Sequence, residues 1–175
     1  MTVTGSGLVL ASIVSGAFLG AILTAAINIW LARRTRHGEE RDRVRTAFAD
    51  AFAAYAAYKE VPYAIRRRRA DASAEERVRL SEILRKIQAD IAYHLAWTAV
   101  ESEPVGRAYT DLINATRAIA GTAMHDAWLT PAPETDSAMN IPSSIVDLTE
   151  LAAYETAYID AARAHLKRLA PWWAR

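Results

Sequence analysis

The fold class follows from one stretch of the sequence, residues 80–98, which reads LSEILRKIQADIAYHLAWT. Its apolar and weakly polar side chains recur at steps of three and four residues, and they fall within an arc of about 120° if each residue turns 100°. The members of this stripe are Leu80, Ile83, Leu84, Ile87, Ile91, His94, Leu95 and Thr98. A stripe with this period predicts an amphipathic helix that buries one side in a core.

Signals at both ends of this stretch predict where the helix begins and ends. Ser73 followed by Glu76 has the spacing of a capping box, in which each side chain satisfies a backbone N–H near the other residue. Ser102 and Pro104 indicate a break and the start of the next helix. The connections at 70–73 and 102–104 are short, so we expect neighbouring helices to be antiparallel.

Three further stretches carry the same helical period. The stretch Glu39–Arg69 contains Pro62, which predicts a kink or a division near Val61. Its stripe comprises Val44, Phe48, Ala51, Phe52, Tyr55, Tyr58, Val61 and Ile65. A stripe that ends near Trp128, before Pro131, comprises Val105, Tyr109, Leu112, Thr116, Ile119, Ala120 and Ala123. The last, which stops at Pro171, comprises Leu151, Tyr154, Tyr158, Ile159, Ala162, Leu166 and Leu169.

Together these stretches predict an all-α domain over residues 39–175, an antiparallel bundle of about four helices. Residues 129–148 contain Pro131, Pro133 and Pro142 and predict a long loop without regular structure. Met139 and Ile141 lie in that loop without a stripe to join. They are either candidate contacts for a protein partner or apolar side chains that pin the loop to the bundle.

Residues 1–32 contain no charged side chain, and within them Gly7–Ala32 reads GLVLASIVSGAFLGAILTAAINIWLA. As a helix this run measures roughly 39 Å, enough to cross a bilayer core. It is too long and lacks the basic start of a cleaved signal peptide. The sequence therefore predicts a short outer N-terminus (1–6), one transmembrane helix (7–32) and a basic juxtamembrane segment (33–38). By the positive-inside rule the domain faces the cytoplasm, and the chain belongs to the cell's inner (plasma) membrane.

Three groups of residues are candidates for contact with lipid or with another helix. Ser12, Gly16, Gly20 and Thr24 recur every four residues, a spacing that allows close helix packing, although small residues are also simply frequent in membrane helices. Arg33, Arg34 and Arg36, with Trp30, are expected at the membrane interface. Trp172 and Trp173 either dock at the inner membrane surface or close the end of the bundle core.

The net charge of +1 conceals an uneven distribution along the chain. Residues 33–69 carry 11 basic and 5 acidic side chains, whereas residues 70–175 carry 10 basic and 15 acidic ones. Arg66, Arg67, Arg68 and Arg69 point in four directions on a helix, so they cannot form one flat patch. They form either a solvated helix end or a docking site for an acidic protein. The overall balance argues against nucleic-acid binding.

The sequence offers little catalytic chemistry. It contains no cysteine, no glycine-rich phosphate loop, no Gly-x-Ser-x-Gly and no His-Glu-x-x-His. None of the four histidines, His37, His94, His125 and His165, lies four residues from another. We expect His94 to be a core histidine with a hydrogen-bond partner rather than a ligand or a catalytic group. The sequence thus predicts neither a metal nor a cofactor.

These observations predict a single-pass membrane protein whose cytoplasmic helical bundle acts as an interaction, adaptor or scaffold module. Its expected partners are membrane lipid and either a protein or a second copy of the chain. The alternative is a membrane-bound enzyme or a small-molecule sensor with a pocket between the bundle helices. The sequence does not identify a ligand for such a pocket.

Overall fold

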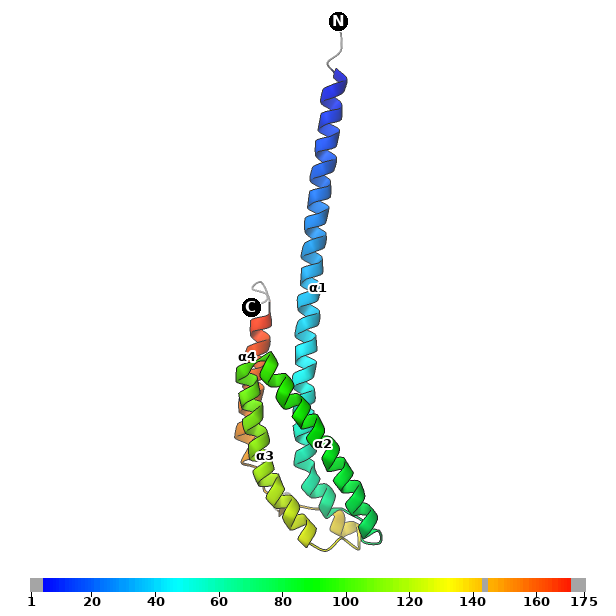
Figure 1. The fold of residues 1–175 in the computed structure, drawn as a ribbon, viewed down its shortest axis with the longest axis vertical. Coiled ribbons are helices and arrows are strands. Elements are labelled where there is room, and N and C mark those ends of the chain that lie inside the picture. The colour runs from blue at the N-terminus through cyan, green and yellow to red at the C-terminus, as the bar shows by residue number, and fades with distance from the viewer. Residues whose placement is uncertain (1–4, 143–144, 171–175) are drawn as a thin grey trace. The chain divides into compact units, whose positions relative to one another are not determined.

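The computed structural model describes residues 5–142 and 145–170. Over residues 5–37 it describes side chains only at Ala25, Ile27, Asn28, Leu31 and Thr35. The described part is all-α and contains four α-helices (Figure 1). They are α1 (Gly5–Arg66), α2 (Ser73–Glu101), α3 (Glu103–Leu129) and α4 (Leu151–Leu169), with a short 3₁₀ helix, η1 (Asp136–Met139), before α4.

The chain divides into two compact units, Met1–Asp42 and Arg43–Arg175, and α1 runs through both. Within the described residues no helix is both long and apolar enough to cross a membrane. Nearly all side chains of the transmembrane helix expected at 7–32 lie outside the described residues, so that helix stays a prediction. The side chains of Ser12, Gly16, Gly20, Thr24, Trp30, Arg33, Arg34 and Arg36, and all of Trp172 and Trp173, lie outside the described residues.

In the second unit consecutive helices run in opposite directions, as the short connections predicted (Figure 1). The apolar stripe expected in the first helical stretch is confirmed, because Val44, Phe48, Tyr55 and Ile65 are all buried. The division expected at Pro62 is wrong, because α1 continues through this residue to Arg66. Pro62 is itself buried, so it packs with the stripe even though its ring removes one backbone hydrogen bond.

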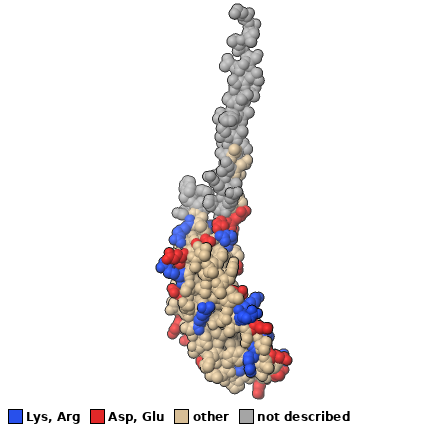
Figure 2. Space-filling view, in the orientation of Figure 1, with Lys and Arg blue, Asp and Glu red and all other residues tan. Residues whose placement is uncertain are grey.

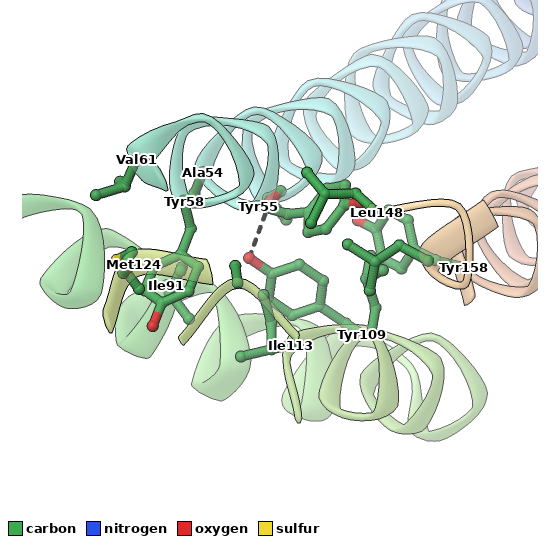
Figure 3. Packing of buried hydrophobic residues seen from close by; sticks show 14 of the residues in the cluster. Ala54, Tyr55, Tyr58, Val61, Ile91, Tyr109, Ile113, Met124, Leu148 and Tyr158 are labelled. Carbon is green, nitrogen blue, oxygen red and sulfur yellow. Dashed lines mark hydrogen bonds between the residues drawn. The ribbon is translucent and has the colours of Figure 1, made fainter. Parts of the chain in front are cut away.

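Tyr55 of α1, Tyr109 of α3 and Tyr158 of α4 fill the centre of the core (Figure 3). Tyr109 of α3 donates its hydroxyl to the carbonyl of Ala51 at 2.9 Å, and Tyr158 of α4 donates to the carbonyl of Phe48 at 2.8 Å. The two rings lie 5.3 Å apart, centroid to centroid. The hydroxyls of Tyr109 and Tyr158 thus each have an acceptor on the α1 backbone, and these two bonds hold α3 and α4 to α1.

The capping box expected at the start of α2 is not formed. Ala72 precedes the helix and makes no side-chain cap, and Ser73 is the first helical residue. The carboxylate of Glu76 instead accepts two bonds from Arg79, at 2.7 and 2.8 Å, and one from the backbone N–H of Arg69 at 3.5 Å. The carboxylate of Glu76 is thus used for the forked pair with Arg79 and for the N–H of Arg69 rather than for a capping box with Ser73.

The stripes of α2 and α3 are largely confirmed, with Leu80, Ile91 and Thr98 buried in the first of them. Ile83 is an exception because it is exposed. In α4 the expected stripe is partly wrong, because Tyr154 and Ile159 are exposed while His165 is buried. Glu155 also lies half-buried beside α1, so the inward face of α4 includes polar side chains that an apolar pattern does not reveal.

Helices α2 and α3 meet at a tight corner, with Ser102 alone between them. A Cβ placed on Gly106 would lie 2.6 Å from the Cα of Ala99, a contact that backbone atoms cannot tolerate. A Cβ on Gly121, further along the same helix, would meet nothing within 4 Å. Gly106 is therefore required by the close crossing of the two helices, and Gly121 is not.

These two glycines provide a matched test of the corner. We expect Gly106→Ala to lower the free energy of unfolding by about 1–3 kcal/mol, because the added methyl forces α2 and α3 apart. Gly121→Ala should instead raise it by about 0.5–1 kcal/mol, because alanine is the better helix former. Urea unfolding followed by far-UV circular dichroism measures both, and equal effects from the two variants would contradict the close crossing.

Candidate functional site

The four arginines at the end of α1 do not share one environment. Arg68 is buried, and its guanidinium donates to the carbonyls of Ile65 at 2.9 Å, Ala127 at 3.0 Å and Thr130. It also lies over the ring of Trp128, 5.2 Å from the centroid. The accepting carbonyls belong to the last turns of α1 and α3, where a cation is favoured. Arg68 thus joins two helix ends and is not part of a solvated cluster.

The other three arginines make separate contacts. Arg66 donates to the hydroxyl of Thr130 at 3.3 Å, and Arg67 donates to the carbonyl of Met139 at 3.2 Å. Arg69 forms a forked pair with Asp71, at 2.8 and 3.0 Å, on the exposed surface. The docking site for an acidic protein stays a prediction; the structure adds that Arg66 and Arg68 both donate to Thr130, whereas Arg67 and Arg69 donate to Met139 and Asp71.

A surface groove of about 790 Å³ lies between α1, the segment before α4, and α4 itself. It is lined by Lys59, Glu60, Tyr63, Arg67, Val146, Asp147, Leu148, Thr149, Ala152 and Glu155. The sequence left open whether Met139 and Ile141 contact a partner or pin the loop; Met139 is exposed and Ile141 is half-buried. Val146 and Leu148 are the buried side chains of this segment, so these two pin the loop to the bundle.

A three-residue polar cluster, Tyr55, Lys59 and Glu155, lies at one side of the groove. Glu155 accepts a bond from Lys59 Nζ at 2.8 Å and a short bond from the hydroxyl of Tyr55 at 2.5 Å. The bonds from Lys59 and Tyr55 lower the pKa of Glu155. Burial, together with the bond to Glu155, raises the pKa of Tyr55, so this tyrosine remains neutral.

A second polar cluster lies at the opposite end of the second unit, where α2 ends. Glu101 accepts a bond from Arg43 at 3.4 Å, and its other oxygen lies 3.2 Å from Nε2 of His165. Phe48 packs against both His165 and Trp97, with ring centroids 5.7 and 5.6 Å away. The sequence did not identify this cluster, because Glu101 and His165 belong to no apolar stripe and lie 64 residues apart.

His94 is half-buried, and its Nδ1 makes no hydrogen bond within the described part of the chain. The expectation of a core histidine with a partner is therefore not met at that nitrogen. Burial lowers the pKa of His94, against the opposing effects of Asp50 and Asp90. Among the residues that the structure describes, no three His, Asp or Glu side chains are grouped to hold a metal ion.

The outward face of α2 carries the most exposed apolar side chains of this helix. Val100 is 91% exposed, Tyr93 62% and Val78 60%. Between them lie the exposed residues Ala89, Ala92 and Ala96. Figure 2 shows charged atoms at both ends of the domain, with a largely uncharged area between them. We call residues 78–100 on this side the outer face of α2.

No protein-family model, no curated protein and no solved structure matches this chain.

The position of Arg68 leads to a mutational prediction. We expect Arg68→Met to lower the free energy of unfolding by about 2–3 kcal/mol, because three buried carbonyl bonds lose a charged donor. The matched variant Arg69→Met should leave stability nearly unchanged, because the Arg69–Asp71 pair lies in solvent. Urea titration of both variants measures the difference, and an equally small effect at Arg68 would contradict its role at the two helix ends.

Glu155 leads to a prediction about pH. Because its pKa is lower in the folded than in the unfolded protein, its contribution to stability is present above the ordinary value of 4.5. That contribution is lost as the pH falls from this value through the lower folded pKa. We expect Glu155→Gln to be less stable than the wild type at neutral pH and less sensitive to acid. Thermal unfolding of the wild type and of Glu155→Gln across this pH range tests the expectation. Melting temperatures that fall equally with pH in the two proteins would refute it.

Proposed function

We propose that this chain is a membrane-anchored interaction protein whose helical domain binds protein through the outer face of α2. Residues 7–32 are the proposed anchor, on the evidence of a 26-residue uncharged run followed by arginines. In this proposal the N-terminus faces outward and the domain lies at the cytoplasmic side of the inner membrane. Membrane lipid is then the first partner and a protein the second.

The observation that carries the protein-binding part is the exposure of Val78, Tyr93 and Val100 on one side of one helix. A single exposed apolar side chain is ordinary on a protein surface and needs no explanation. A contiguous apolar strip is different, because it costs free energy in water and is typical of interaction sites. Ala89, Ala92 and Ala96 join Tyr93 and Val100 in an apolar strip about 17 Å long, whereas the exposed Glu82 and Arg85 separate it from Val78.

A second candidate function is that of an enzyme or small-molecule sensor, and the groove beside Lys59 favours it. The sequence placed such a pocket between the bundle helices, whereas the groove of about 790 Å³ is lined by the surface of α1, residues 146–149 and α4. Its volume suits a small ligand. Within this groove Lys59 forms an ion pair with Glu155, and Asp147 accepts bonds from the backbone N–H and the hydroxyl of Thr149. We therefore rank this function second.

The experiment is crosslinking of the full, tagged chain in native membranes that have been washed with alkaline carbonate. We expect the chain to stay in the membrane pellet and to crosslink to protein. The variants Tyr93→Glu and Val100→Glu should lose the crosslinked species, because a charge on the strip opposes its burial. Leu129→Glu is the control, since Leu129 is an equally exposed apolar residue, 72% exposed, outside the outer face.

Two results would contradict this function. Release of the full chain by carbonate would remove the proposed anchor. Crosslinking that survives Tyr93→Glu and Val100→Glu unchanged would remove the outer face of α2 as the binding surface.

A further inference from the structure

We propose that the helical domain docks on an anionic lipid surface through the end at which α1 enters it. This end is formed by residues 43–49 of α1, residues 95–109 at the corner of α2 and α3, and residues 163–170 at the end of α4 (Figure 1). We call it the basic end. The inference rests on the proposed function, which places an anchor at 7–32, and it adds a contact of the domain itself with the membrane.

Side-chain contacts hold the segments of the basic end together. Glu101, at the end of α2, accepts a bond from Arg43 at 3.4 Å, and its other oxygen lies 3.2 Å from Nε2 of His165. The guanidinium of Arg43 also lies over the ring of Trp97, 5.8 Å from its centroid. Arg168 donates to Nδ1 of His165 at 3.4 Å, since arginine has no acceptor. The ends of α1, α2 and α4 therefore form one surface.

The charge of the domain is divided between its two ends. The basic end carries six basic and two acidic side chains, a balance of +4. The basic ones are Arg43, Arg45, Arg107, Arg163, Lys167 and Arg168. The opposite end, residues 60–79, 123–142 and 145–157, carries six basic and ten acidic side chains, a balance of −4. A negatively charged surface therefore attracts one end of the domain and repels the other.

Both carboxylates of the basic end are engaged by partners of the same end. The side chain of Glu101 is only 20% exposed, and each of its oxygens has a partner. Glu103 pairs with Arg107, with 3.3 Å between the charged atoms. Arg45 and Lys167, in contrast, are exposed and form no ion pair with any residue that the structure describes. These two side chains therefore offer positive charge to an external anion.

The way the chain is connected favours lipid over an acidic protein as that anion. Arg43 follows Ala32, the end of the proposed anchor, by eleven residues, which is about 17 Å of helix. The basic end is therefore the end to which the anchor is joined. Its cations come from three helices, with Arg45 on α1, Arg107 on α3 and Lys167 on α4. A bilayer offers anions across a plane, and each lysine or arginine brought near it strengthens binding about five-fold.

The chain contains no cysteine, so a single cysteine can carry a fluorophore at either end of the domain. Ala164→Cys labels the basic end and Ser137→Cys the opposite end, both at exposed positions. The full chain is reconstituted into vesicles with acceptor dye on their headgroups. We expect energy transfer from position 164 to be higher in an equal mixture of phosphatidylcholine and phosphatidylglycerol than in phosphatidylcholine alone. High salt should remove the difference, because it screens the charges.

Transfer from position 137 is the control, and it should not rise with the anionic lipid. Equal transfer from position 164 in the two kinds of vesicle overturns the docking. A rise of the same size from both positions also overturns it, because the domain would then approach the lipid without a preferred end.

Charge reversal tests which side chains bind the lipid. The double variant Arg45→Glu and Lys167→Glu should lower the ratio of docked to undocked domain about ten-fold or more, because two attractions become repulsions. Arg77→Glu is the control, since Arg77 is also exposed and outside any ion pair of the described residues, but lies at the opposite end. It should not lower the ratio. These surface changes should leave the fold intact. A double variant that docks like the wild type overturns the inference.

The outcomes separate this inference from the proposed function. Transfer independent of lipid charge, from a chain that alkaline carbonate does not release, overturns the docking and leaves the anchor standing. Release by carbonate removes the anchor, whereas salt-sensitive flotation of the full chain with the mixed vesicles, lost in the double variant, would still support the docking. Equal transfer in both kinds of vesicle, with loss of crosslinking to an acidic protein in the double variant, overturns lipid as the partner of the basic end.

Discussion

The helical domain depends on two hydrogen bonds that end on the backbone of α1. Tyr109 and Tyr158 reach from α3 and α4 to the carbonyls of Ala51 and Phe48, one turn apart, and their rings lie against each other. Without an acceptor on α1 each buried hydroxyl would carry an uncompensated desolvation cost. The two bonds therefore fix how far α3 and α4 can rotate about α1. The groove beside Lys59, which is lined by both α1 and α4, follows from that placement.

The sequence predicted the helices well where burial is apolar. The stripe that contains Val44 and Phe48 and the one that contains Tyr109 are both confirmed, because the period of apolar residues reports the buried side. The apolar pattern predicted only part of the inward face of α4, because Glu155 and His165 face the bundle there through partners on α1 and α2. No local pattern contains those partners. The capping box failed for a related reason, because the carboxylate of Glu76 is used for the forked pair with Arg79.

The candidate site was less predictable than the fold. The run of four arginines was visible, but the acceptors that bury Arg68 include the carbonyls of Ala127 and Thr130, about sixty residues further along the chain. Their position depends on where α3 ends. The sequence offered Met139 and Ile141 as partner contacts or as the side chains that pin the loop, and it did not identify the buried Val146 and Leu148. Val146 and Leu148, two residues apart and both buried, were a signal that period-two counting could have found.

The tyrosine bonds also set the order in which this domain can form during synthesis. Tyr158 lies 110 residues after its acceptor at Phe48, and at ribosomal speeds this separation takes about 5 to 20 s to translate. During that interval the apolar side of α1 has no partner from α4. Helical domains ordinarily fold through contacts between residues that are close in the sequence. This domain is complete only once its last helix has been translated. The part of α1 that Tyr158 covers therefore gains its partner only at the end of synthesis, after α2 and α3 have already been made.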